Sequence, residues 1–324
     1  MIKGWFVWLG VVLALTASPA LAQSCGCEVS RPKQQQYDRL LQLTTKQKNT
    51  ALHAHLPFGI PVPRSGATNE PVLVQRDYVI GYDDMLRIPI WTGHRLRSVD
   101  LASQRERLEC FRRDPRIRDA GSAAFCADYD EPIFDRGHMV PNSDMERSEA
   151  AMINTYMFTN MTPQHCAFNR GIWQALEALV RHWAKESETL FVITGSVFDA
   201  NSDGLRDPPA NATRIKARNG ASRVAVPTHF YKALFRLGTD GVPDPMVIML
   251  PNVNRKVPES QGRHYLEQHL MSVAEIETVT GLDLLPATGL PPAQLRRVKN
   301  SKVASLWPLP NSWPRHLDSN CRDN

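Results

Sequence analysis

One short run of polar residues carries most of the chemistry in this 324-residue chain. Asp135-Arg136-Gly137-His138 places a histidine next to an arginine, and the following stretch of about forty residues adds amide and carboxyl side chains at Asn160, Asn169 and Glu177. A histidine accepts protons near neutral pH, an arginine stabilises phosphate charge, and uncharged or anionic oxygens are ligands for hard metal ions. Together these residue types predict metal-assisted cleavage of a phosphodiester bond.

Two further blocks follow this run in the chain, Thr159–Gln164 and Asn169–Glu177. With the Asp-Arg-Gly-His run they resemble the DNA/RNA non-specific endonuclease family, which includes secreted bacterial nucleases and mitochondrial endonuclease G. Shorter matches, among them Val226–Lys232, extend the resemblance roughly from Tyr78 to Leu285. The resemblance implies an α+β fold, a mixed α/β sandwich around a central antiparallel sheet, with the active site in a ββα-metal (His-Me) finger.

His138 is the predicted general base. An imidazole accepts a proton from water near neutral pH, and its second nitrogen helps to position the ring. The alternative is a structural or surface histidine, which is our interpretation of the other nine of the ten histidines. Gly137 is expected to let the backbone turn tightly so that the ring faces a cleft. Asp135 is interpreted as structural, because the family uses the histidine as its base.

Arg136 offers a fixed fork of donors that matches phosphate oxygens. The alternative is an ion pair with Asp135 or another carboxylate. The resemblance places Arg136 and Asn160 in the active site, with Asn160 assisting the substrate or the hydrogen-bond network and Gln164 playing an architectural part. The family also implies one more arginine just before the finger, for which the sequence offers three candidates: Arg107, Arg112 and Arg113.

Asn169 is the predicted direct metal ligand, on the resemblance. A carbonyl oxygen plus several waters suits Mg²⁺, with Mn²⁺ as the alternative ion, and an N-cap is the alternative role for this residue. Glu177 follows eight residues later on the predicted helix, roughly 12 Å along its axis and rotated by about 80°. Glu177 is therefore expected to orient groups around the metal rather than bind it. An exposed helical glutamate is the alternative.

The first 22 residues have the pattern of a secretory signal peptide. Lys3 is followed by the apolar stretch Trp5–Leu15 and by the small-x-small site Ala20–Ala22. The apolar stretch is too short to span a bilayer. We expect a secreted or periplasmic protein without stable membrane association.

The six cysteines all follow this predicted signal. An even number in an exported chain predicts disulfides. Cys110 and Cys126 flank a short loop before the Asp-Arg-Gly-His run and are expected to bond. The partners of the other four stay open, since six cysteines allow fifteen connectivities.

Composition and the positions of proline and glycine divide the chain into segments. The formal charge of +5 suits a polyanionic partner without identifying one. The predicted segments are a signal peptide (1–22), an N-terminal extension and linker (23–70), the endonuclease domain (71–290) and a Pro-rich basic tail (291–324), expected to be extended. Residues 78–91 are predicted to form a hairpin. Further strands are predicted at 190–194, 229–235 and 246–250, and a helix from 169 to 185.

The sequence therefore predicts an exported, Mg²⁺-dependent endonuclease that hydrolyses DNA and RNA to products with a 5′-phosphate. His138 is the base, Arg136, Asn160 and Glu177 complete the catalytic set, and Asn169 holds the metal. Low base specificity is expected if the enzyme reads the backbone alone. The alternatives are a non-catalytic nucleic-acid-binding protein on a nuclease scaffold and a phosphodiesterase of small substrates. The sequence leaves open whether the protein forms a homodimer.

Overall fold

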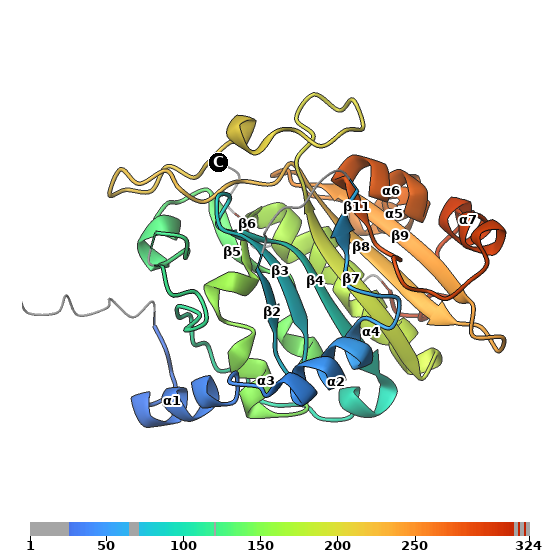
Figure 1. The fold of residues 1–324 in the computed structure, drawn as a ribbon. Coiled ribbons are helices and arrows are strands. Elements are labelled where there is room, and N and C mark those ends of the chain that lie inside the picture. The colour runs from blue at the N-terminus through green and yellow to red at the C-terminus, as the bar shows by residue number, and fades with distance from the viewer. Residues whose placement is uncertain (1–25, 65–70, 120, 314–316, 318–320, 322–324) are drawn as a thin grey trace, which may run out of the picture.

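A seven-stranded antiparallel sheet forms the centre of the molecule (Figure 1). The computed structural model describes residues 26–64, 71–119, 121–313, 317 and 321. The predicted strands and hairpin are present, and the predicted antiparallel sheet is confirmed. In spatial order the strands are β10 (Leu270–Met271), β9 (Pro243–Pro251), β8 (His229–Leu237), β7 (Thr189–Val197), β4 (Ile88–Arg97), β3 (Val79–Asp83) and β2 (Val72–Val74).

The sheet is packed on both faces, so the molecule has three layers. Successive strand residues point to opposite faces. On β7, Phe191 and Ile193 belong to one apolar core, while Leu190 and Val192 belong to the other. Helices α2 (Thr45–His55) and α6 (Val273–Thr280) contribute residues to the first core. Helices α4 (Gln174–Glu186) and α5 (Gly262–Gln268) contribute residues to the second.

Three more helices lie at the periphery. In Figure 1 α1 lies beside α3 at one edge of the molecule, and α7 lies at the opposite side. Their bounds are α1 (Arg31–Arg39), α3 (Glu149–Asn154) and α7 (Pro292–Asn300). The tail was expected to be extended, and α7 corrects that expectation. Pro292 stands at the first helical position, where the missing N–H of proline costs no hydrogen bond.

The helix predicted from 169 to 185 is two elements. A π-helical turn, η5 (Phe168–Trp173), precedes α4, and the backbone departs from helical geometry at Gly171 (φ −110°, ψ −111°). The apolar stripe of α4 is buried as expected, with Leu176 and Val180 facing the sheet core. A single straight axis from Asn169 to Glu177 is therefore wrong, because the kink lies between the two residues.

The C-terminal tail covers part of this helix. The indole nitrogen of Trp313 donates to the carbonyl of Ala175, and that of Trp183 donates to the carbonyl of Pro308. A disulfide between Cys166 and Cys321 attaches the tail just before η5. The tail is thus part of the packing around α4 rather than a free appendage.

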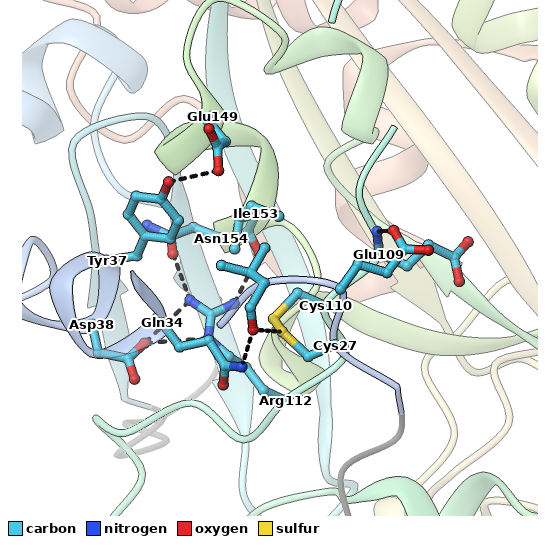
Figure 2. The surroundings of a disulfide bond; sticks show 12 residues. Cys27, Gln34, Tyr37, Asp38, Glu109, Cys110, Arg112, Glu149, Ile153 and Asn154 are labelled. Atoms are coloured by element: carbon cyan, nitrogen blue, oxygen red, sulfur yellow. Dashed lines mark hydrogen bonds and ion pairs between the residues drawn. A yellow bond between two sulfur atoms is a disulfide. The ribbon is translucent and has the colours of Figure 1, made fainter. Parts of the chain in front are cut away.

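The N-terminal extension is attached in a similar way (Figure 2). Cys27 forms a disulfide with Cys110, and the two residues also form an isolated antiparallel bridge. Arg112, two residues along, donates to Asp38 of α1 and to the side chain of Asn154 in α3. The expected Cys110–Cys126 bond is wrong. Cys126 is disulfide-bonded as well, so no described cysteine is free.

The predicted linker contributes one short strand. β1 (Val62–Pro63) pairs with β11 (Leu282–Asp283), which joins the predicted linker to the C-terminal end of the predicted endonuclease domain. The predicted signal peptide, 1–22, lies outside the described residues. Within the described ranges, every helix is too short or too polar to cross a bilayer.

Candidate active site

A two-stranded hairpin followed by a helix carries most of the predicted site residues. β5 (Phe134–His138) pairs antiparallel with β6 (Met161–His165), so that His138 stands opposite Met161 and Asp135 opposite Gln164. The chain then enters η5 and α4, which carry Asn169 and Glu177. This is the ββα arrangement that the sequence predicted.

The structural requirement for glycine at position 137 differs from the one expected. Its backbone is in the strand and does not turn. A Cβ at this position would lie 2.1 Å from Cδ of Gln164, whose buried side chain packs across the strand pair. Only glycine therefore allows Gln164 to lie flat between β5 and β6, which gives Gln164 the architectural part predicted for it.

A cleft of about 1,030 Å³ opens beside this hairpin. It gathers four of the five predicted site residues, His138, Arg136, Asn169 and Glu177. The charged side chains of the lining are five carboxyl groups and four arginines: Glu109, Asp130, Glu131, Asp135, Glu177, Arg107, Arg136, Arg170 and Arg181. The arginines alone do not make the cleft strongly basic, so a polyanion would need additional positive charge to bind deep within it.

His138 has an aromatic and cationic environment. Its ring packs edge-on against Tyr156 at 4.8 Å between centroids and lies 6.3 Å from the ring of Phe111. Nε2 is enclosed and without a hydrogen-bond partner among the described residues, and the residue lines the cleft. Burial, followed by the charges of Arg107 and Arg136, lowers the pKa of His138 to about 3. The imidazole is therefore neutral at pH 7 and able to accept a proton.

Arg136 is held by an aromatic ring instead of a carboxylate. Its guanidinium lies 4.0 Å from the ring centroid of Phe111, within the range of cation–π attraction. Asp135, the alternative partner weighed from the sequence, pairs with Arg170 at 2.6 Å. The donors of Arg136 make no hydrogen bond to the described residues and are available to an anion in the cleft.

Asn169 is oriented by its neighbour on the hairpin. Its side-chain nitrogen donates to Oδ2 of Asp135 at 2.9 Å, and Oδ1 makes no hydrogen bond to the described residues. The side chain does not cap the helix, since η5 has no side-chain cap. The described residues contain no cluster of three His, Cys, Asp or Glu side chains able to hold a metal. Few protein ligands are what Mg²⁺ commonly uses, so Asn169 Oδ1 fits such an ion.

Glu177 lies on the floor of the cleft. Its side chain is 14% exposed, and Oε1 lies 4.0 Å from the ammonium nitrogen of Lys232. Burial raises the pKa of Glu177 to about 7, and the charge of Lys232 opposes that rise. The expectation of an exposed helical glutamate, weighed as the alternative, does not fit this position.

Asn160 does not line the cleft. The residue is fully buried, and its amide oxygen accepts from Val140 N while its nitrogen donates to the carbonyls of Val140 and Thr155. Val140 follows His138 by two residues. Asn160 therefore fixes the backbone directly after the predicted base, and the structure leaves no part of its amide free to face a substrate.

Two arginines complete the cleft. Of the three candidate arginines that the sequence offered, only Arg107 lines the cleft. Arg112 hydrogen-bonds to residues of α1 and α3, and Arg113 stacks on Phe125. Arg181 was missed, although it follows Glu177 by four residues and so shares its helix face. Arg181 also donates to the buried carboxylate of Asp144 at 3.2 Å.

The sequence model for DNA/RNA non-specific endonucleases matches residues 60–290, most of the chain. The chain belongs to this family. The match begins eleven residues before the domain start predicted at residue 71, and it includes the hairpin, η5 and α4. Family membership makes the protein a nuclease, a hydrolase that acts on nucleic acids.

Three relatives illustrate the similarity. The chain is 30% identical over 248 residues to the zebrafish (Danio rerio) protein named Nuclease EXOG, mitochondrial, which covers 75% of this chain and 68% of the relative. It is 30% identical over 215 residues to human Endonuclease G, mitochondrial, covering 65% and 68%. Nuclease C1 of Cunninghamella echinulata is 31% identical over 236 residues, covering 70% of this chain and 85% of the relative.

Proposed function

We propose that the protein is an exported, Mg²⁺-dependent endonuclease that hydrolyses phosphodiester bonds of DNA and RNA with His138 as its general base. The observation that supports this most is the meeting of four predicted residues, His138, Arg136, Asn169 and Glu177, in one cleft. They come from β5 and from the contiguous elements η5 and α4, and the pairing of β5 with β6 brings these two parts of the chain together.

His138 would take the proton of the attacking water at Nδ1. The neutral ring is the form that can do so, and burial together with the charges of two nearby arginines keeps it neutral in the free protein. A bound phosphate would balance the charges of Arg107 and Arg136, which raises the basicity of the ring when the substrate is present. The nucleophile then attacks phosphorus opposite the 3′ oxygen, and the product ends in a 5′-phosphate.

Arg136 would bind the phosphate whose charge increases in the transition state. Its stacking on Phe111 holds the guanidinium plane without consuming its donors. Because phosphate oxygens are the same at every nucleotide, binding through them gives low base specificity. Both DNA and RNA are therefore the expected substrates.

Asn169 Oδ1 would hold Mg²⁺, with Mn²⁺ as the alternative. Bound there, the ion supplies positive charge to the phosphate and to the departing 3′ oxygen. Asp135 accepts from the amide nitrogen of Asn169, which leaves the amide oxygen free to bind a cation in the cleft. Glu177 would orient groups around this position, and Asn160 would position His138 through Val140.

Export is part of the same proposal. The two described disulfides, Cys27–Cys110 and Cys166–Cys321, suit an oxidising compartment. The names of two relatives place those proteins in mitochondria, so the compartment needs its own test. We expect the protein in the periplasm or medium of its host, starting after residue 22, and N-terminal sequencing of that material checks it. Sedimentation equilibrium decides whether two chains associate.

Incubation with supercoiled plasmid and with RNA, with and without Mg²⁺, tests the proposed activity. Both substrates should be cut internally with Mg²⁺, and EDTA should stop the reaction. Binding without cutting under every metal condition would favour the non-catalytic alternative. Faster turnover of a chromogenic phosphodiester than of plasmid would favour the small-substrate alternative.

A further inference from the structure

Lys232 is a charged residue in an apolar part of the sheet. It lies on β8 between Phe230 and Leu234, which point to the same face and belong to the core beneath α4. The side chain of Lys232 is only 1% exposed. The alternation of the strand calls for an apolar residue here, and the resemblance assigns this lysine no role.

The contacts of Lys232 lead to the floor of the cleft. Its ammonium nitrogen donates to Oγ1 of Thr194, the residue opposite it on β7, at 3.1 Å. It lies 4.5 Å from the ring centroid of Trp173 and 4.0 Å from Oε1 of Glu177. Glu177 is the only carboxylate within ion-pair distance of Lys232 among the described residues, and it is the one contact that reaches the cleft.

Burying an ammonium ion in an apolar core costs free energy unless a partner compensates for the lost hydration. Burial lowers the pKa of Lys232, and the charge of Glu177 opposes that change. The effect is mutual, because Lys232 favours the ionised form of Glu177. The pair therefore stabilises a carboxylate at a depth where a carboxyl group alone would be neutral over a wider pH range.

We propose that Lys232 is a positioning residue for phosphodiester hydrolysis, acting from beneath the cleft by holding the Glu177 carboxylate in place. The inference rests on the proposed function, since it gives Glu177 a part in the reaction. Thr194 and Trp173 fix the ammonium from two sides, so that the attraction has a defined direction.

The other charged groups in this layer are accounted for. Asp144, which raises the pKa of Glu177, accepts from His94 at 3.1 Å and from Arg181 at 3.2 Å. Arg181 opposes the effect of Asp144 on Glu177. Asp144 thus has two nitrogen partners of its own. Its charge also raises the pKa of Lys232, but Glu177 is the carboxylate that lies within ion-pair distance of Lys232 among the described residues.

The first test is a double-mutant cycle. Lys232→Met, which keeps the length of the side chain and removes its charge, should lower kcat for plasmid about 10- to 100-fold. In a Glu177→Gln background the same change should alter kcat less than about threefold, because the carboxylate it serves is gone. Equal losses in both backgrounds would overturn the proposal and leave Lys232 a structural residue.

A matched control separates coupling from general damage. Lys299 forms an ion pair with Glu277 at 2.9 Å in a half-buried position outside the cleft lining. Lys299→Met should leave kcat unchanged in folded protein. If Lys232→Met fails to fold, Thr194→Val removes the hydroxyl that holds the ammonium at nearly constant volume. Thr194→Val should lower kcat several-fold in the wild type only, and a loss that persists with Gln at 177 would refute the proposal.

A measurement independent of turnover completes the test. The carboxyl ¹³C resonance of Glu177, assigned through Glu177→Gln, can be titrated in metal-free protein. Replacing Lys232 with Met should shift its titration upward, because a nearby positive charge is lost. An unchanged titration would contradict the inference even if the enzyme is active. If the wild type does not cut nucleic acid but the shift is present, the proposed function fails and the pairing stands.

Discussion

Asn169 donates its side-chain amide hydrogen to Asp135 across the junction between β5 and η5, over 2.9 Å. The same carboxylate accepts two hydrogen bonds from Arg170, at 2.6 and 2.8 Å. Since the amide nitrogen faces Asp135, the amide oxygen faces away from it. Asp135 therefore leaves the oxygen of Asn169 as the atom available to the proposed metal ion.

Replacing Asp135 should change the metal requirement. In Asp135→Ala the amide loses its acceptor and turns freely, so the Mg²⁺ concentration for half-maximal activity should rise about 10- to 100-fold. Arg170→Gln is the matched control, because it removes the ion pair and keeps the Asn169 contact. A Mg²⁺ titration of cutting compares the two, and equal effects would show that the ion pair matters rather than the orientation of the amide.

Asn169→Ala and Glu177→Ala should differ in kind. Removing Asn169 should nearly abolish cutting at any practical Mg²⁺ concentration, because no other carbonyl or carboxylate is proposed to hold the ion. Removing Glu177 should lower the rate by about 10- to 100-fold, with partial recovery at raised Mg²⁺. The reverse pattern in a metal titration would exchange the roles assigned to the two residues.

The pH dependence should reveal Glu177 rather than His138. The pKa of Glu177 is raised to about 7, so the carboxylate is lost as pH falls through 7. The pKa of His138 is lowered to about 3, so the free protein keeps a neutral base above that value. We expect kcat/KM to fall below about pH 7 in the wild type. Glu177→Gln should be slower but lack this fall, and its persistence there would assign it to another group.

The Cys27–Cys110 disulfide should stabilise the wall of the cleft. Residues 107, 109 and 111 line the cleft, whereas Cys110 and Arg112 face the N-terminal extension. The bond closes a loop of 83 residues, for which loop entropy gives about 4.5 kcal/mol in a model-dependent calculation.

Cys27→Ser with Cys110→Ser should lower the free energy of unfolding by several kcal/mol and reduce cutting. Urea unfolding followed by a plasmid assay on the folded fraction measures both. Asp38→Asn, which weakens the Arg112 contact and keeps the disulfide, should have the smaller effect. Unchanged stability in the double variant would mean that the extension is held by its other contacts.

The sequence predicts much of this site because the relevant signals are local. The ββα arrangement around His138 and Asn169 follows from a resemblance carried by short blocks with clear residue types, although the helix predicted from residue 169 is interrupted at Gly171. The antiparallel sheet follows from the same resemblance and from predicted strands that no regular helical crossovers connect. The role of Asn160 could not be predicted from the sequence, because its hydrogen-bond partners are backbone atoms, which any residue type supplies.

Other features depend on contacts between distant segments. The bond between Cys110 and Cys27 joins parts of the chain 83 residues apart, and spacing favours the nearer Cys126. The kink at Gly171 lies in an otherwise helical pattern. From the sequence, Lys232 is a strand residue whose side chain could point to either face of the sheet. Its contact with Glu177 becomes evident only in the structure. For the disulfide and for Lys232 the deciding partner belongs to another part of the chain.

The most direct measurement compares cutting and binding by His138→Ala. Plasmid nicking in Mg²⁺ should fall about 100- to 10,000-fold, since the proton acceptor for water is lost. Binding of a labelled oligonucleotide, followed by anisotropy, should remain within a few-fold of the wild type because phosphate contacts dominate affinity. Near-normal nicking by folded His138→Ala protein would contradict the account, whereas lost nicking with retained binding is the result that it predicts.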